Sequence, residues 1–449
     1  SEKTGCCVSD LRNDRDFVRL FKVDCCEYPF VRLHGDSLLF YSSLPILKVN
    51  KEFGLLAQDE SYSIITAISF HINSVHAELT ILKVWMLRLA RIRRQIPITR
   101  KRVYLDNAGA GPPTIPVINA MNEFLQEWRD HGSYWHKWLQ EIIDARKLFA
   151  KLIGASFEEV ALVSNVTSGI ISIATSLEYK RSGNAVLSDQ NFPTNIYIWH
   201  ARRNAGFLKD VRVLRNRDGR IPIQEYEKAI DDRTVIVPVD YVSYQNGYRE
   251  SLREITEIAH SHGAIVLVDA FQALGVLPID VKELQIDILV SGMYKWLLGP
   301  HSPAFMYVRK ELIPKLHPTV TGWWGVKDTV ITRTIERRDL FGKPYNVDDA
   351  VVSDTATRFE WGSPSVIAVA GAKAALSFAI KNNLPSQFHR IQSLTQRLAD
   401  GLSRIGRRIV TPLEPEHRSG IICFKDPHPS RTVAKLDGAG ISVSGRYGA

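Results

Sequence analysis

The chain has 449 residues, which is enough for two or three domains. Hydrophobic residues make up 45% and charged residues 23%, proportions that exclude a disordered chain, a fibre or a disulfide scaffold. The formal net charge of +9 is compatible with an anionic cofactor or substrate. Because the sequence has neither a basic stripe nor a nucleic-acid motif, we expect no nucleic-acid partner.

The cysteines and the apolar stretches indicate the cellular compartment in which the protein is found. Four of the five cysteines form two adjacent pairs near the N-terminus, where neighbouring side chains do not converge on one ion. We therefore expect free thiols, no metal site and a reducing compartment. The start of the chain is polar, and the most apolar stretch, near 64–90, contains His71, Glu78 and Lys83. These features predict a cytoplasmic protein without a signal peptide or a membrane span.

The sequence pattern changes near Arg100. Residues 1–100 are irregular and end in a basic run, so we expect an N-terminal extension, to which the pattern assigns no role. From Val103 onward, short apolar runs alternate with helical patterns. The predicted strands are 160–164, 185–188, 235–240, 265–269, 286–291 and 304–308. The predicted helices are 116–153, 169–177, 223–230 and 252–262. This alternation predicts an α/β fold with a mainly parallel sheet between two layers of helices. Ligands of such sheets bind at the carboxyl ends of the strands.

Asp269 ends one of these strands. A carboxylate at the tip of a buried strand is costly unless a cation or hydrogen-bond donors pair with it. A helix cap or an ordinary salt bridge is one explanation. Another is a partner for the protonated ring nitrogen of pyridoxal 5'-phosphate (PLP), whose ring stores electrons withdrawn from a substrate.

Lys295 lies about 26 residues further on, between an apolar strand and the Gly299-Pro300 turn. Tyr294 and Trp296 flank it, which is unusual for a solvated lysine, although a lysine with its stem along an apolar surface shows the same pattern. Partial burial would lower the pKa of the amine and make it nucleophilic, as a lysine that forms a Schiff base requires. Asp269 and Lys295, in this order and spacing, predict a PLP site.

Two further segments carry groups that suit this cofactor. Thr167 and Ser168 stand at a predicted strand-to-helix turn, where free backbone N–H groups and two hydroxyls make a phosphate cradle or a plain helix cap. Phe192 follows the strand 185–188, where an aromatic ring either stacks on a flat cofactor or belongs to the core.

These segments resemble the class V aminotransferase family of fold-type I PLP enzymes. The resemblance begins at Tyr104 and runs to the end of the chain. The matching segments are 104–113 (the family's YLDNAA start), 159–170 (phosphate turn), 268–272 (Asp-x-x-Gln/His), 293–297 (lysine motif) and 358–364 (RFExGTP). The resemblance implies a large PLP-binding domain over 101–345, with an N-terminal segment that contributes to the small domain, and a small C-terminal α+β domain over 346–449.

The resemblance also implies residue roles. Lys295 would hold the cofactor as a Schiff base and move the alpha proton of the substrate, Asp269 would pair with the pyridinium nitrogen, and Gln272 would contact the phenolic oxygen of the ring. The other implied cofactor contacts are phosphate binding by Thr167, Ser168 and Tyr294 and ring stacking by Phe192. Family members are homodimers with shared active sites, so Trp323 and Ser363 would reach the partner's phosphate.

The motifs lie between two lyase groups of the family. Gln272 resembles the cysteine desulfurases and selenocysteine lyases, whereas Phe192-Pro-Thr and 322–325 resemble the kynureninases. Desulfurases use a late, mobile cysteine, but Cys423 lies in an apolar run that predicts a buried strand, so we do not expect it to accept sulfur. Family members continue into a segment with an arginine that grips the substrate carboxylate. We therefore expect a truncated small domain in which Arg446 takes this role.

We expect a PLP-dependent enzyme that cleaves the side chain of an amino acid. The alternatives are an aminotransferase or amino-acid epimerase of the same family, and a non-catalytic relative that keeps the fold and uses its surface for binding.

Overall fold

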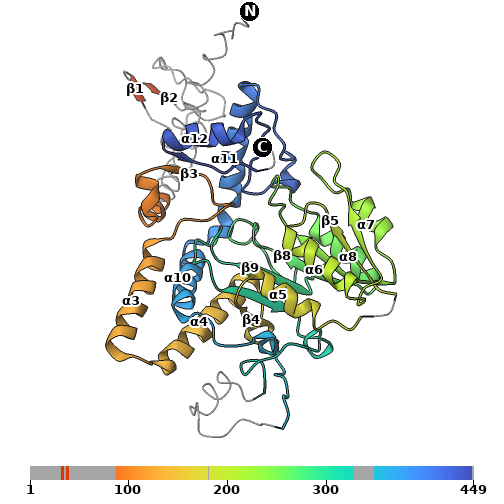
Figure 1. Cartoon of the computed structure of the whole chain (residues 1–449). Helices are drawn as coiled ribbons and strands as arrows, with labels where there is room; N and C mark the ends of the chain where they lie inside the picture. The colour runs from red at the N-terminus through yellow and green to blue at the C-terminus, as the bar shows by residue number, and fades with distance from the viewer. Residues whose placement is uncertain (1–31, 35–36, 40–86, 180–181, 328–347, 447–449) are drawn as a thin grey trace, which may run out of the picture.

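The computed structural model describes residues 32–34, 37–39, 87–179, 182–327 and 348–446. Two short strands, β1 (Arg32–His34) and β2 (Ser37–Leu39), form an antiparallel pair. The rest is built around one seven-stranded sheet (Figure 1). Its strands are β4 (Val160–Val163), β5 (Asn184–Ser188), β6 (Asp210–Leu214), β7 (Thr234–Asp240), β8 (Ile265–Asp269), β9 (Ile288–Gly292) and β10 (Ala304–Val308).

The strands of this sheet follow the order β4-β10-β9-β8-β7-β5-β6. Only β10 runs antiparallel to its neighbours, β4 and β9, and the other pairs are parallel. The predicted strands and the mainly parallel sheet are thus confirmed. The strand β6 was not predicted, because it lies at the edge of the sheet and its run is interrupted by Arg212.

Helices connect and cover the strands. They are α3 (Ile115–His131), α4 (Trp135–Ile153), α5 (Val166–Ala174), α6 (Pro193–Asn204), α7 (Ile223–Ala229), α8 (Leu252–Ser261), α10 (Val366–Asn382), α11 (Phe388–Arg404) and α12 (Pro429–Gly438). The prediction of one helix over 116–153 was wrong. Gly132, at φ 64°, ends α3 in a conformation that glycine adopts without strain, and the chain turns back into α4. Both helices pack against α10.

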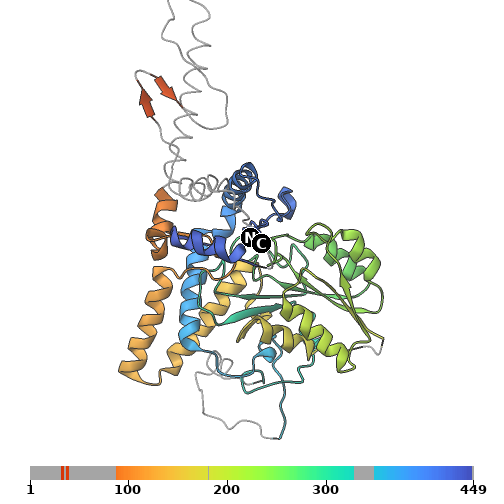
Figure 2. The same cartoon turned by 45° about the horizontal axis from the view of Figure 1, so that its top comes forward.

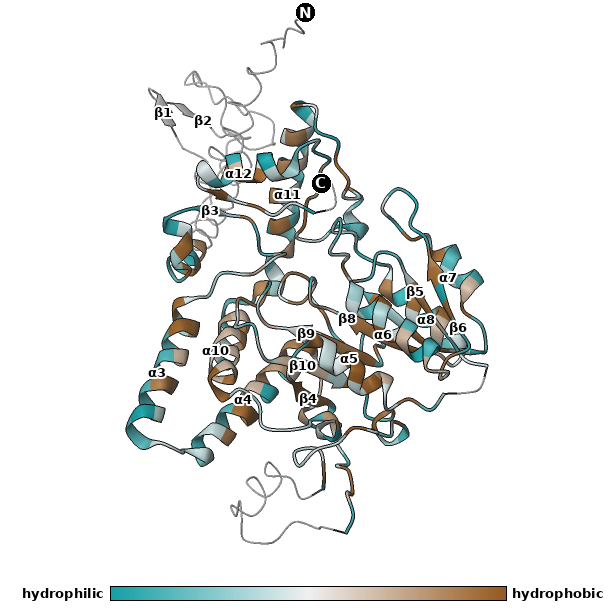
Figure 3. Ribbon diagram, viewed as in Figure 1, coloured by the Kyte–Doolittle hydropathy of each residue, from teal (hydrophilic) through white to brown (hydrophobic). Residues whose placement is uncertain are grey.

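Side chains of the sheet alternate between two hydrophobic cores. In β4, Val160 and Leu162 belong to a core with α4, α8 and α10. Ala161 and Val163 point the other way, into a core with α5 and with Trp199 of α6. Figure 3 shows hydrophobic residues along the strands and along the inner faces of the helices. Burial on both faces explains the short, continuous apolar runs in the sequence.

A third, smaller core lies among the C-terminal elements. The strand β11 (Ile441–Ser442) pairs in parallel with β3 (Val103–Tyr104). Ile441 packs with Leu402 of α11 and Leu436 of α12. Figure 2 shows these blue helices above the sheet. The segment after residue 100 thus joins the C-terminal elements, while the domain boundaries at 345 and 346 stay a prediction.

The described residues hold no helix that is both long and apolar enough to cross a bilayer. Among the same residues, no group of three or more His, Cys, Asp or Glu side chains is placed to hold a metal ion. The four N-terminal cysteines lie outside the described residues.

Candidate active site

The carboxyl ends of five strands meet at one edge of the sheet. β4, β5, β7, β8 and β9 run in the same direction, because β10 is the antiparallel strand between β4 and β9. The turns after β4 and β5 lead into α5 and α6, which begin at Val166 and Pro193. β7 and β8 end in Asp240 and Asp269, and Lys295 follows β9. The topology therefore gathers the predicted residues at the place where such sheets bind ligands.

Lys295 is only 8% exposed. Its Nζ lies 4.4 Å from the ring centroid of Phe271 and 5.8 Å from that of Phe192. Phe271 can lie here because Gly292 has no side chain, since a Cβ at 292 would stand 2.3 Å from the ring. Burial lowers the pKa of Lys295 to about 8, against the opposing effect of Asp269. About a tenth of this amine is therefore uncharged and nucleophilic at pH 7.

Asp269 and Asp240 are neighbouring buried carboxylates. They are register partners on the parallel strands β8 and β7. The Oδ1 of Asp269 accepts a hydrogen bond from the Phe271 backbone N–H at 2.9 Å. Burial raises the pKa of Asp269, and Lys295 opposes this rise. A cation beside Asp269, such as a protonated ring nitrogen, would stabilise its charged form.

The first turn of α5 holds Thr167 and Ser168, which the sequence predicts to bind a phosphate. Asn165 caps the helix by accepting from the Ser168 N–H at 2.8 Å, and the Ser168 Oγ donates to the Asn165 carbonyl at 2.7 Å. The Thr167 Oγ1 lies 3.0 Å from the Oγ1 of Thr194, in the first turn of α6. Two helix N-termini and two hydroxyls thus converge, an arrangement that favours an anion. The N–H and the hydroxyl of Ser168 are both used by the cap, so the structure shows the helix cap, and a role of Ser168 toward a phosphate stays a prediction.

Aromatic rings surround the amine. The ring of Phe192, 38% exposed, packs edge-on against Tyr244 at a centroid distance of 5.0 Å. Tyr294 packs edge-on against Phe271 at 4.8 Å and stacks on His301 at 4.3 Å. Burial raises the pKa of Tyr294, so its hydroxyl stays a neutral donor. These rings would border a flat cofactor held at Lys295, with Phe192 on one side.

Gln272 is held at both ends of its amide. Its Oε1 accepts from the Trp296 Nε1 at 2.9 Å, and its Nε2 donates to the Ala108 carbonyl at 2.9 Å. One hydrogen on Nε2 is left for the phenolic oxygen that the sequence analysis assigned to it.

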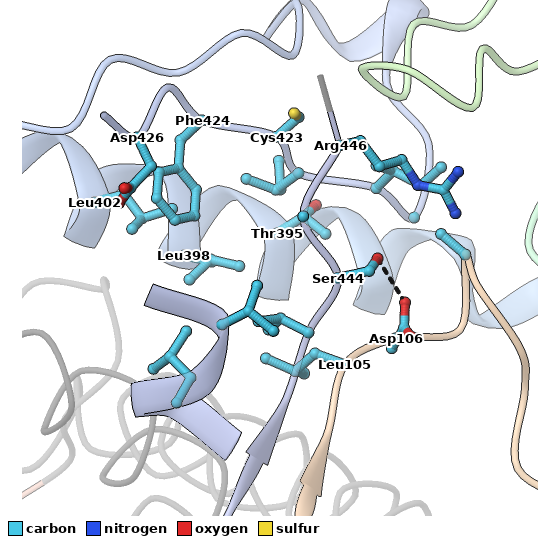
Figure 4. Close-up of a pocket in the computed structure, with 18 of the residues that line it drawn as sticks. Leu105, Asp106, Thr395, Leu398, Leu402, Cys423, Phe424, Asp426, Ser444 and Arg446 are labelled. Atoms are coloured by element: carbon cyan, nitrogen blue, oxygen red, sulfur yellow. Dashed lines mark hydrogen bonds between the residues drawn. The ribbon is translucent and has the colours of Figure 1, made fainter. Parts of the chain in front are cut away.

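Arg446 stands near the site, beside a largely apolar cavity of about 290 Å³. Its guanidinium carbon lies 5.7 Å from the ring centroid of Tyr244. Its positive charge lowers the pKa of Lys295, an effect smaller than that of burial. Figure 4 shows Arg446 at one end of the cavity, with its guanidinium directed away from Leu398 and Leu402. This position is compatible with the predicted grip on a substrate carboxylate.

Cys423 also lines this cavity. The predicted buried strand around it was wrong, because only Phe424 forms a β-bridge, to Ile409, and Cys423 itself is half-buried. Burial raises the pKa of its thiol, which disfavours the thiolate that sulfur transfer needs.

Trp323 and Ser363 lie on the surface. The ring of Trp323 is 38% exposed and packs edge-on against Trp324. Ser363 is exposed just before α10. Their assignment concerns the partner's site and stays a prediction.

The sequence analysis missed several residues of the site. They are Asp240, Asn191, Asn195, Thr194, Phe271, Trp296 and His301. A signal for Asp240 was present, since it ends an apolar strand just as Asp269 does. Trp296 was noted only as a neighbour of Lys295, and Phe271 gave no signal, because an apolar side chain near a buried strand is an ordinary core residue.

The donors present fit PLP. The buried amine of Lys295 suits the aldehyde of that cofactor, and the carboxylate of Asp269 suits its ring nitrogen. The N-terminus of α5 suits the phosphate, and the face of Phe192 suits the ring.

Comparison with known proteins gives the same family. The family model described as aminotransferase class-V matches residues 103–449. An uncharacterized aminotransferase of Bacillus subtilis is 34% identical over 285 residues, which cover 64% of this chain and 71% of that protein. A probable cysteine desulfurase of Methanothermobacter thermautotrophicus is 28% identical, over 80% of this chain and 87% of that protein. A kynureninase of Deinococcus radiodurans is 27% identical, over 79% and 87%.

Solved structures share the fold. The apo structure of a cysteine desulfurase from Thermococcus onnurineus matches with a TM-score of 0.70 at 24% identity, over 79% of this chain and 86% of that chain. This likeness confirms the α/β architecture of fold type I. Together with the family match over residues 103–449, it identifies the chain as a member of the class V aminotransferase family of PLP-dependent enzymes.

Proposed function

We propose that this enzyme is a lyase that holds PLP on Lys295 and cleaves the side chain of an amino acid. The observation that carries the proposal is the buried amine of Lys295, with its pKa lowered to about 8, beside the strand-end carboxylate of Asp269. A solvated lysine would have neither this burial nor this pKa. A non-catalytic relative would have no use for a buried amine whose pKa is lowered toward neutral.

When bound, PLP supplies a ring that withdraws electrons from the bonds of the substrate's alpha carbon. Asp269 would accept the ring N–H, and Gln272 would donate its remaining amide hydrogen to the phenolic oxygen. The first turn of α5, with Thr167, would bind the phosphate. Phe192 would cover one face of the ring and exclude water from it.

Lys295 would then act as a base and an acid. Its amine has the lowered pKa that a proton carrier at neutral pH needs. We propose that it takes the proton from the substrate's alpha carbon and returns protons when the side-chain bond breaks. Arg446 would hold the substrate carboxylate and so orient the alpha C–H bond.

The named relatives support side-chain cleavage, since they include cysteine desulfurases and a kynureninase. The structure argues against Cys423 as a sulfur acceptor, because burial raises the pKa of its thiol. We therefore propose a substrate whose leaving group needs no cysteine thiolate. We also propose a homodimer with shared sites, to which Trp323 and Ser363 contribute, and a cytoplasmic location.

One experiment separates the reactions. The PLP-loaded enzyme is incubated with a panel that includes L-cysteine and L-kynurenine, and the products are identified by mass spectrometry. Side-chain cleavage followed by protonation leaves alanine, whereas transamination leaves the oxo acid of the intact substrate. Lys295→Ala is the control and should form neither product. If oxo acids form without alanine, the enzyme is an aminotransferase and not a lyase. The name of the Bacillus subtilis relative points to this alternative.

A further inference from the structure

Asp240 occupies the end of β7 and is 7% exposed. Three N–H groups converge on its carboxylate. The Phe192 backbone N–H donates to Oδ2 at 2.6 Å, and the Asn195 Nδ2 and Asn191 Nδ2 donate to Oδ1 at 2.7 and 3.2 Å. Asn191 and Phe192 belong to the turn that joins β5 to α6, and Asn195 lies in the first turn of α6. One carboxylate therefore fixes the turn that presents Phe192 to the site.

The same carboxylate lies among the charged groups of the site. Asp269 on β8 is its register partner. Burial and the charge of Asp269 raise the pKa of Asp240, whereas the hydrogen bonds from Asn195 and Phe192 and the charge of Lys295 lower it and so favour the carboxylate. Glu250, on the segment between β7 and α8, is also buried and interacts with Asp240 electrostatically. Arg446 acts on Lys295 from the C-terminal segment. A buried carboxylate is costly unless hydrogen-bond donors satisfy it, so its place beside the reacting groups calls for a function.

We propose that Asp240 is a positioning residue, which holds the Phe192 turn over the cofactor and supplies a second negative charge beside Asp269. This inference rests on the proposed function, because it assigns a role toward the same cofactor. Through Asp269 and Lys295 the charge would favour protonation of the ring nitrogen and of the lysine amine. Through the turn, Asp240 would keep Phe192 in place.

These two effects can be separated by substitution. Asp240→Asn keeps the shape of the side chain and removes the charge. Asn195→Ala removes one hydrogen bond to Asp240 and keeps the charge. Asp210→Asn is the control, because it removes a carboxylate charge at the start of the edge strand β6, away from the carboxyl ends of the strands where the site lies.

The charge is tested on cofactor-free protein. Lys295 is acetylated with acetic anhydride over a series of pH values, and its labelling is followed by peptide mass spectrometry. The wild-type amine should titrate near the pKa of about 8. Since a negative charge stabilises the ammonium form, Asp240→Asn should lower this pKa, whereas Asn195→Ala and Asp210→Asn should leave it unchanged. An unchanged pKa in Asp240→Asn would overturn the electrostatic role.

The turn is tested on the loaded protein by visible circular dichroism of bound PLP, which reports the environment of the ring. Both Asp240→Asn and Asn195→Ala should change this signal, and Asp210→Asn should not. A wild-type signal in both variants would overturn the positioning role. If wild-type protein does not bind PLP at Lys295, the proposed function fails, and the titration of the cofactor-free amine still decides the charge effect separately.

Discussion

The indole N–H of Trp296 donates to the amide oxygen of Gln272, with 2.9 Å between Nε1 and Oε1. Because the Nε2 of the same amide donates to Ala108, this bond fixes which way the amide faces. The indole ring of Trp296 packs directly on Gly420, since a Cβ at position 420 would stand 2.7 Å from the ring. Trp296, the neighbour of Lys295 in the chain, thus orients the Gln272 amide, which we propose to donate to the phenolic oxygen of PLP.

Trp296→Phe should weaken PLP binding about 2- to 10-fold, because a neutral hydrogen bond contributes about 0.5–1.5 kcal/mol. The phenyl ring keeps much of the packing against Gly420, but Gln272 can then rotate. Absorbance titration with PLP measures the affinity. Trp128→Phe, at a ring that is 56% exposed, is the control and should bind as wild type does. An unaltered affinity in Trp296→Phe would mean that Gln272 needs no such orientation.

Thr167→Ala should weaken binding of PLP by about 10- to 100-fold, since hydrogen bonds to charged groups contribute about 1.5–3 kcal/mol. Binding of pyridoxal, which lacks the phosphate, should hardly change. The two affinities are compared for wild type and variant. Equal losses for both ligands would place Thr167 outside the phosphate cradle.

Arg446→Met should raise the KM for the amino acid far more than it lowers kcat, because the guanidinium is proposed to bind the carboxylate. It should also raise the pKa of the Lys295 amine above about 8, because the positive charge of Arg446 lowers that pKa. Steady-state kinetics and the acetylation titration measure the two effects. Arg404→Met, on α11, is the control. If the variant keeps the wild-type KM and the wild-type pKa of Lys295, Arg446 is not part of the site.

The Arg146–Glu360 pair ties the 358–364 segment to the sheet. Its Nη2–Oε1 distance is 2.6 Å, both side chains are almost fully buried, and Glu360 also accepts from the Leu162 N–H. Arg146→Met leaves a buried charge unpaired and should destabilise the protein by about 3–5 kcal/mol. Urea denaturation measures the loss in the free energy of unfolding. Arg129→Met, at an exposed pair with Asp130, should cost far less, because solvent screens an exposed ion pair. Similar losses for both variants would contradict the account.

Much of the fold could be predicted from the sequence, because strands buried on both faces leave short apolar runs. The break at Gly132 could not, since the helical pattern continues on both sides of it. The predicted residues Lys295, Asp269, Thr167 and Phe192 lie at one sheet edge, since each follows or ends a strand of the same direction. The contacts of Asp240 and the Gln272–Trp296 hydrogen bond could not be predicted, because they depend on which strands are neighbours. The sequence pattern does not contain the strand order.

The position at which PLP attaches covalently decides whether Lys295 holds the cofactor. The purified protein is incubated with PLP, reduced with borohydride, digested and mapped by mass spectrometry. Attachment should rise with pH through about 8, the pKa of the Lys295 amine, and should be found on the Lys295 peptide. Lys295→Ala should carry no specific label. Labelling spread over surface lysines, or labelling that persists in Lys295→Ala, would contradict the account.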